Sequence, residues 1–415
     1  MLTFAFVKMH APLFPLAVCL IAGITMSEYL HDWTLGGTVY SGWMLGLALF
    51  AVAVAATALL YRWPRCQTAG IWLCFVLLGL TLGGRSLETG NHETGSRSRE
   101  TEVSGVQRHF LEWRSELLEK YHEWGVGDEA YGVVAAMTLG DKQAIDKDTK
   151  ETYRVAGASH ILALSGLHLM IIYSVITLLV GWMRFRLLSQ VIIVLAIWAF
   201  ALLTGLSPSV TRAAAMITIY ALLSLGYRER MSVNTIAFVA IVMLIISPAM
   251  LYDVGFQLSF MAVLSIVLWH PQLNGLIPLH IQQRYRWLSS LWGLTTVSTA
   301  AQIGTAPLVA YYFGRLPVWF LLSNFIVIPL ATVVLYLTLA LVVISWWSLA
   351  ATLVAQVLTT VVVMMERGLA WVGTLPYSSI NNIQLSLPRV YLIYIIIGSL
   401  YVAVSLRFPA TRRSV

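Results

Sequence analysis

The stretch SHILALSGLHLMIIYSVITLLVG, from Ser159 to Gly181, is an apolar run long enough to cross a bilayer. Its first half nevertheless carries small and polar residues, namely His160, Ser165, Gly166 and His168. Polar groups at membrane depth cost free energy unless they face a protein interior or a wet cavity, so this run predicts a helix that lines a functional space. The alternative is a packing helix, in which Ser165 and Gly166 allow close approach and the histidines bond to neighbouring carbonyls.

The composition of the chain fits a membrane protein and no soluble globular domain. Of the 415 residues, 59% are hydrophobic and 11% are charged, and the mean hydropathy is +0.78. The apolar runs are continuous, whereas the strands of a transmembrane β-barrel alternate apolar and polar residues. The predicted fold class is therefore all-α, a polytopic helical membrane protein, because helices satisfy the backbone in hydrocarbon. Cys19, Cys66 and Cys74 lack metal-ligand spacing and are expected to be free thiols.

Further apolar runs predict about twelve membrane spans, with a range of about 11–13. They lie at about residues 11–30, 41–61, 69–87, 159–181, 187–204, 208–227, 232–247, 249–269, 288–313, 317–344, 349–372 and 390–406. Pro248, Pro307 and Pro329 are expected to break spans into half-helices. Residues 1–87 thus form an N-terminal three-span region, residues 130–406 a larger membrane domain, and residues 407–415 a basic tail.

Residues 88–129 separate these two membrane regions and are polar. They hold ten of the nineteen acidic residues and five basic ones, so this segment must lie in water. Its first part, residues 90–97, has no periodicity and is predicted to be a flexible linker. Its apolar residues then recur every three or four positions, at Val106, Phe110, Trp113, Leu117, Tyr121 and Trp124. This spacing predicts an amphipathic helix that lies on the membrane or against the spans.

Two short segments precede the apolar run at residues 159–181, which we call the organising run. Residues 130–139 predict a short apolar helix that ends at Gly140-Asp141-Lys142, and residues 145–155 predict a polar helix.

Basic residues gather on one side of the twelve-span arrangement. They are Lys8, Arg62, Arg65, Arg184, Arg186, Arg228, Arg230, Arg284, Arg286, Arg407, Arg412 and Arg413. In the short loops on the other side, only Arg315 and Arg389 depart from this pattern. Because basic loops stay cytoplasmic, both termini are predicted to be cytoplasmic and residues 88–129 to lie outside.

In this orientation, polar and helix-breaking groups converge on the outer leaflet. They are His160 and His168, Gly205 to Ser209 with Arg212, Asp253 to Ser259, Gln302 to Pro307, Asn324, and Glu366-Arg367. Together they predict a water-filled funnel open to the outside. Each group also has a structural alternative. In these alternatives, Arg212 and Asp253 form an ion pair, Gln302 and Asn324 bond across helices, and Glu366-Arg367 extends to the interface.

Metal and enzyme sites have little support in the sequence. His160 and His168 lie eight residues apart, which is about 12 Å along a helix and too far to share one ion. The chain contains no HExxH, no GxSxG and no P-loop. We therefore expect no metal, no cofactor and no catalytic residue. The alternative, Ser165 as the nucleophile of a membrane hydrolase, requires a base within hydrogen-bond reach.

Four ordered sequence motifs between Gly140 and Pro329 resemble those of one known family, the ComEC competence channels. The first comprises Gly140-Asp141, Tyr153-Arg154-x-x-Gly157-x-Ser159-His160 and Ala163-Leu164-Ser165-Gly166-Leu167-His168. The second is Thr204-Gly205 with Ser209-x-x-Arg212-Ala213, and the third is Asp253-Val254-Gly255-Phe256-Gln257-Leu258-Ser259-Phe260. The fourth runs over Ala301-Gln302 to Pro307, Phe313-Gly314, and Asn324 to Pro329.

The resemblance implies a channel domain over residues 130–406 that passes single-stranded DNA through the inner membrane into the cytoplasm during natural transformation. It implies an external DNA-receptor protein and a separate nuclease as partners, beside the membrane lipid. The OB-fold insert and the C-terminal metallo-β-lactamase-like nuclease of many family members are not expected in this chain. The residues expected to line the DNA conduit are Arg154, His160, Ser165, Gly166, His168, Ser209, Arg212, Asp253, Gln257, Gln302 and Asn324.

Physical arguments agree with that expectation. A strand with one phosphate charge per nucleotide needs an aqueous path with cations near its mouth, such as Arg154, His160 and Arg212. Moving an anion against an inside-negative potential costs about 2.3 kcal/mol per charge per 100 mV, so a cytoplasmic ATP-driven translocase or helicase must pull the strand. The alternative function is a secondary transporter or exporter of a small or lipid-like anion.

Overall fold

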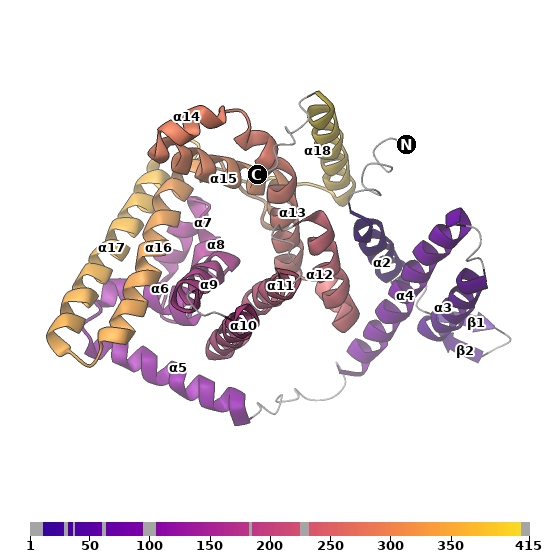
Figure 1. Cartoon of the computed structure of the whole chain (residues 1–415), viewed down its shortest axis with the longest axis horizontal. Helices are drawn as coiled ribbons and strands as arrows, with labels where there is room; N and C mark the ends of the chain where they lie inside the picture. Colours follow the sequence, from indigo (N-terminus) through magenta and orange to yellow (C-terminus); the bar gives the residue numbers. More distant parts are fainter. Residues whose placement is uncertain are drawn as a thin grey trace. The chain divides into compact units, whose positions relative to one another are not determined.

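The computed structural model describes residues 11–28, 32–35, 38–59, 64–93, 105–181, 185–224 and 232–407 (Figure 1). These residues form helices joined by short connections, with two small two-stranded sheets. The chain forms two compact units. The first comprises Met1–Glu102 with Arg230–Val267, and the second comprises Val103–Glu229 with Leu268–Val415. The predicted domain 130–406 includes residues of both units and stays a prediction.

The first unit is a bundle around α4. Its elements are α2 (Leu13–Ser27), β1 (Asp32–Leu35), β2 (Thr38–Ser41), α3 (Gly42–Leu59), α4 (Pro64–Glu93), α12 (Val233–Ile246), the 3₁₀ helix η2 (Pro248–Tyr252) and the start of α13 (Val254–Asn274). Strands β1 and β2 form an antiparallel hairpin, with Asp32 opposite Ser41, that the sequence reading did not predict. Helix α12 is tied to α2 by the Leu13 amide, which donates to Asn234 Oδ1 at 2.8 Å.

Glycines set the contact between α2 and α4. A Cβ atom at Gly79 would overlap the carbonyl oxygen of Leu20 and lie 2.9 Å from the amide nitrogen of Ile24. A Cβ atom at Gly23 would likewise overlap the carbonyl oxygen of Val76. The two backbones thus approach as closely as small residues allow, which is how helices associate where lipid removes the hydrophobic driving force.

The second unit holds the remaining helices. They are α5 (Gly105–Glu123), α6 (Asp128–Leu139), α7 (Lys147–Val155), α8 (Ser159–Leu162), α9 (Gly166–Val180), α10 (Arg186–Leu203), α11 (Pro208–Ser224), α14 (Leu279–Arg284), α15 (Arg286–Phe313), α16 (Phe320–Ile344), α17 (Ser348–Thr374) and α18 (Leu387–Arg407). Strands β3 (Leu316–Pro317) and β4 (Ser379–Ile380) pair antiparallel. The α16–α17 hairpin lies beside α6 and α7 (Figure 1).

Helix α6 forms the core of this unit. Every residue from Gly132 to Leu139 is buried, and the helix packs against α16 and α17. A short helix that is apolar on all sides has no face for water, so it is enclosed by other helices. Gly140 ends α6 in the left-handed conformation at φ +75°, as a C-terminal glycine commonly does.

The all-α fold is confirmed, and among the residues that the structure describes five helices are long and apolar enough to cross a membrane. They are Cys66–Ser86, Val254–Asn274, Phe320–Ile344, Ser348–Thr374 and Leu387–Arg407. Five shorter apolar helices are Leu13–Ser27, Gly46–Leu59, Gly166–Val180, Leu187–Leu203 and Val233–Ile246. The count of about twelve spans stays a prediction. The three cysteines are free thiols, as expected.

Several predicted boundaries are wrong. Helices α15 and α16 continue through Pro307 and Pro329, because neighbouring groups in a bundle can satisfy the backbone that proline leaves unbonded. Pro248 does end a helix, since η2 and Asp253 separate α12 from α13. Residues 90–93 belong to α4 and not to a linker.

Other predictions lie outside the described residues. They concern linker residues 94–97, tail residues 408–415, and the basic residues Lys8, Arg62, Arg184, Arg228, Arg230, Arg412 and Arg413.

The predicted amphipathic helix is α5. Tyr121 on its apolar face is buried, and its hydroxyl lies 3.1 Å from Thr138 Oγ1 on α6. Leu117 packs against the same core, while Val106 at the far end is exposed. The apolar periodicity therefore predicted the helix and the side that packs at its C-terminal half, whereas Val106 and Trp113 on the same face are exposed.

Candidate functional site

Three helix ends meet at Gly140. A Cβ atom at this glycine would lie 2.7 Å from Leu164 Cδ1 and 3.6 Å from the carbonyl oxygen of Thr204. A Cβ atom at Gly166 would lie 3.9 Å from Ala213 Cβ on α11. We call these contacts the helix junction: it joins the end of α6, the α8–α9 connection, the end of α10 and the first turns of α11. The first and second sequence motifs thus come together.

The organising run is broken at the helix junction. Ala163 and Ser165 have extended backbones, with ψ of 131° and 173°, and α9 begins only at Gly166. The prediction of one continuous helix is therefore wrong, because Ser165 serves as the N-cap of α9. His160 lies on α8, before the break, so the periodicity of α9 does not relate it to Ser165 and His168.

His168 completes this cap. The Ser165 amide donates to His168 Nδ1 at 3.3 Å, and Ser165 Oγ lies 2.9 Å from the same nitrogen. This is a capping box with histidine in the place of the usual Glu or Gln. Because an amide only donates, Nδ1 is an acceptor and the ring proton lies on Nε2. His168 is fully buried, and Nε2 has no hydrogen-bond partner within the part of the chain that the structure describes.

Ser165 is thus within hydrogen-bond reach of a base, as the hydrolase alternative requires. The contact is local, between the N-cap and the third residue of one helix, and it uses Nδ1. The described residues place no carboxylate on Nε2, which a triad needs to orient its histidine. The geometry is that of a helix cap.

The start of α11 supplies a cation. Arg212 is only 6% exposed and precedes Ala213, the neighbour of Gly166. Ser209 is half-buried in the first turn of α11. A buried guanidinium in an apolar helix is costly unless it is paired, and both predicted roles of Arg212, as a conduit cation and as a member of an ion pair, stay predictions.

Helix α7 is anchored to the loop between α15 and α16. Arg315 Nη1 donates to Glu151 Oε1 at 2.7 Å, and Arg154 Nη1 lies 3.7 Å from Glu151 Oε2. The hydrogen bond from Arg315 lowers the pKa of the Glu151 carboxyl. Arg154 therefore lies beside a carboxylate, although it was predicted as a conduit cation. Gly157, at φ +76°, packs against Pro317.

A further cation reaches the helix junction from α5, and the sequence reading missed it. Arg114 Nη2 lies 4.0 Å from Asp141 Oδ1, and Nη1 lies 3.5 Å from where a Cβ atom of Gly205 would be. Arg114 is a charged residue of an amphipathic helix, and its partner is 27 positions away, so no local pattern signals the pair.

Gln302 on α15 and Asn324 on α16 are half-buried. Neither has a hydrogen-bond partner among the residues that the structure describes, so the alternative in which they bond across helices is wrong for this structure. Half-buried amides without protein partners are expected to bind water.

Asp253 and Gln257 belong to the first unit, whereas the other candidates belong to the second. Asp253 Oδ1 accepts from the Phe256 amide at 2.6 Å and so caps the first turn of α13. Gln257 Nε2 donates to the Leu251 carbonyl at 2.9 Å. The predicted pairing of Arg212 with Asp253 would join the two units and stays a prediction. Among the described residues, no three His, Cys, Asp or Glu side chains are arranged to hold a metal ion.

Comparison with known proteins places the chain in a family. The model of the family described as "Competence protein" matches residues 137–407, which include the helix junction. The chain belongs to the competence protein family. The resemblance of its motifs to the ComEC family is thereby confirmed.

Three relatives show how far this family likeness extends. ComE operon protein 3 of Bacillus subtilis is 30% identical over 55% of this chain and 27% of its own length. An uncharacterized protein of Aquifex aeolicus is 27% identical over 51% of this chain and 47% of its own length. Recombination protein 2 of Haemophilus influenzae is 24% identical over 52% of this chain and 29% of its own length. The matches thus cover less than half of each relative's length, and no solved structure matches this competence protein.

Proposed function

We propose that this competence protein takes part in DNA uptake during transformation, as an inner-membrane channel that passes single-stranded DNA into the cytoplasm. Family membership and the likeness to ComE operon protein 3 support the role in uptake. The observation that carries the channel proposal is the break at the helix junction. It interrupts the apolar run at residues 159–181 and starts α9 at Gly166. This residue lies next to Ala213, which follows the buried Arg212.

The physical chemistry of the helix junction suits a polyanion. A helix N-terminus carries a partial positive charge and free amide hydrogens, and both favour a phosphate. The α9 N-terminus begins at the exposed Gly166, and Arg212 lies on the neighbouring helix one residue from Ala213. Irregular backbone at membrane depth is tolerated where it lines a water-filled cavity. The half-buried Gln302 and Asn324 add polar groups that form no hydrogen bond with the residues that the structure describes.

The proposal includes partners and an orientation. Both termini lie in the cytoplasm, where an ATP-driven translocase or helicase pulls the strand against the membrane potential. An external receptor delivers DNA, and a separate nuclease degrades the second strand. The chain itself performs no catalytic step in this scheme.

Gly166 offers the sharpest test, because a larger residue at Ser165 would also remove the helix cap. A Cβ atom at Gly166 meets only Ala213, at an ordinary contact distance of 3.9 Å. We expect Gly166→Ala to transform normally. Gly166→Trp should insert stably but abolish transformation, because the indole fills the space in front of the α9 N-terminus. Gly398→Trp on α18, where a Cβ atom meets nothing within 4 Å, is the matched control.

The measurements are transformation frequency, entry of labelled single-stranded DNA and the amount of protein in the membrane. Normal transformation by stably inserted Gly166→Trp would refute the channel at this position. Transport of a small organic anion by proteoliposomes, with no passage of DNA, would instead favour the alternative of a secondary anion transporter, whose broken helices present N-termini to anions in the same way.

A further inference from the structure

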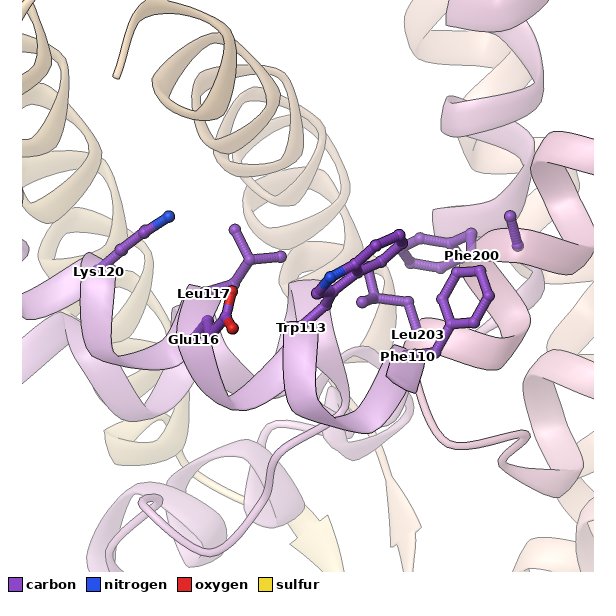
Figure 2. Close-up of a pocket in the computed structure, with 8 residues that line it drawn as sticks. Phe110, Trp113, Glu116, Leu117, Lys120, Phe200 and Leu203 are labelled. Atoms are coloured by element: carbon purple, nitrogen blue, oxygen red, sulfur yellow. The ribbon is translucent and has the colours of Figure 1, made fainter. Parts of the chain in front are cut away.

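A groove runs between the amphipathic helix α5 and the C-terminal end of α10. Its volume is about 440 Å³. Its apolar lining consists of Phe110, Trp113, Leu117, Ala199, Phe200 and Leu203. Figure 2 shows the aromatic rings and Leu203 gathered at one end, and Glu116 and Lys120 towards the other. The groove is therefore apolar with one charged end, which is the polarity of a lipid.

The groove continues into an exposed apolar stripe on α10. Leu188, Val191 and Leu195 are 45%, 46% and 64% exposed, and their spacing places them on the same helix face as Ala199. From Leu195 to Leu203 the helix rises about 12 Å, close to the ~15 Å of hydrocarbon in one leaflet. An acyl chain can thus lie along α10 and enter the groove from the bilayer.

The charged end has one group of each sign. Glu116 and Lys120 are four residues apart on α5, a spacing at which side chains commonly pair. In the described part of the chain, however, neither side chain forms an ion pair or a hydrogen bond. An unpaired carboxylate and ammonium about 5–6 Å apart at their Cβ atoms complement a headgroup with both a phosphate and a primary ammonium.

We infer that this groove binds one phosphatidylethanolamine molecule. The acyl chain packs between Trp113 and Phe200, Lys120 bonds to the phosphate, and Glu116 accepts from the ethanolamine ammonium. The lipid then fixes α5 to α10 and with it Arg114, which reaches Asp141 at the edge of the helix junction. This inference does not rest on the proposed channel function.

Native mass spectrometry of the purified full-length chain, after exchange into phosphatidylethanolamine or phosphatidylglycerol, tests the site. Wild type should retain one phosphatidylethanolamine and little phosphatidylglycerol. Lys120→Gln, an exposed change that leaves the fold intact, should lower retention about tenfold, equivalent to ~1.4 kcal/mol. Ala199→Trp should fill the groove and abolish retention. Leu222→Trp, at an exposed position on α11 outside the groove, is the control and should retain lipid as wild type does.

Two results would overturn the inference. Equal retention of both lipids by wild type would show a nonspecific lipid shell. Unchanged retention of phosphatidylethanolamine by Lys120→Gln would show that the charged end does not bind the headgroup. This result would hold even if Ala199→Trp fails to fold.

Discussion

Gly157 combines a left-handed backbone with a close neighbour, and the two together exclude a larger residue. It ends α7 at φ +76°, and the Ala158 amide behind it donates to the Tyr153 carbonyl at 2.7 Å, as in a Schellman motif. A Cβ atom here would lie 2.6 Å from Pro317 Cγ and 2.7 Å from Pro317 Cβ. The proline ring is rigid, so the contact cannot be relieved by a rotamer change.

We expect Gly157→Ala to destabilise the second unit by the sum of these two effects. The left-handed conformation costs alanine about 1–2 kcal/mol, and overpacking costs typically about 1–3 kcal/mol, so the total is about 2–5 kcal/mol. Pro317→Gly removes both contacting carbons. In that background, the cost of Gly157→Ala should fall to the conformational part of about 1–2 kcal/mol.

Thermal unfolding of the four purified proteins in one detergent measures this double-mutant cycle. The same loss in both backgrounds would show that Gly157 and Pro317 do not touch. No loss in either background would refute the left-handed conformation as well. Because α8 starts two residues after Gly157, transformation by Gly157→Ala should fall together with its stability.

Two further predictions concern packing and pH. Gly79→Ala should lower the free energy of unfolding by about 1–3 kcal/mol, because the added methyl group forces α2 away from α4. Gly398→Ala, where a Cβ atom meets nothing within 4 Å, should leave it unchanged or raise it by up to about 1 kcal/mol. Equal melting temperatures for the two variants would contradict the close approach of α2 and α4. Arg315 lowers the pKa of Glu151, so the pair stabilises the protein above the unfolded carboxyl pKa of about 4.3, and this contribution is lost as the pH falls through the lowered folded value. Because both side chains are partly exposed, it amounts to at most about 1 kcal/mol, and Arg315→Gln should remove it; identical stability-versus-pH curves for the variant and wild type would disprove the coupling.

Local patterns in the sequence determined the elements of the fold. Continuous apolar runs require helices in hydrocarbon, because nothing else there can bond the backbone, and this gave the all-α class and most helix positions. The period of Phe110, Trp113, Leu117 and Tyr121 predicted α5 and its apolar face, of which Tyr121 is fully buried. The ordered motifs gave the family, since they depend on residue identity and not on packing.

Local patterns could not settle how a helix breaks. Ser165-Gly166 inside an apolar run is compatible with close packing or with a cap, and the bond from the Ser165 amide to His168 shows that it is a cap. Pro307 and Pro329 lie within helices, although proline usually ends them. Each choice depends on whether neighbouring groups satisfy the freed backbone atoms, and a linear sequence does not identify those neighbours.

Only the tertiary structure brought distant residues together. Glu151 and Arg315 are 164 positions apart, and the contacts of Gly140 with Leu164 and Thr204 join the ends of α6 and α10 to the α8–α9 connection. The groove between α5 and α10 likewise exists only because two remote segments pack side by side. The sequence supplies the apolar faces, the glycines and the charges. Which faces meet is decided by the fit of all the helices at once, so those contacts cannot be read from any one of them.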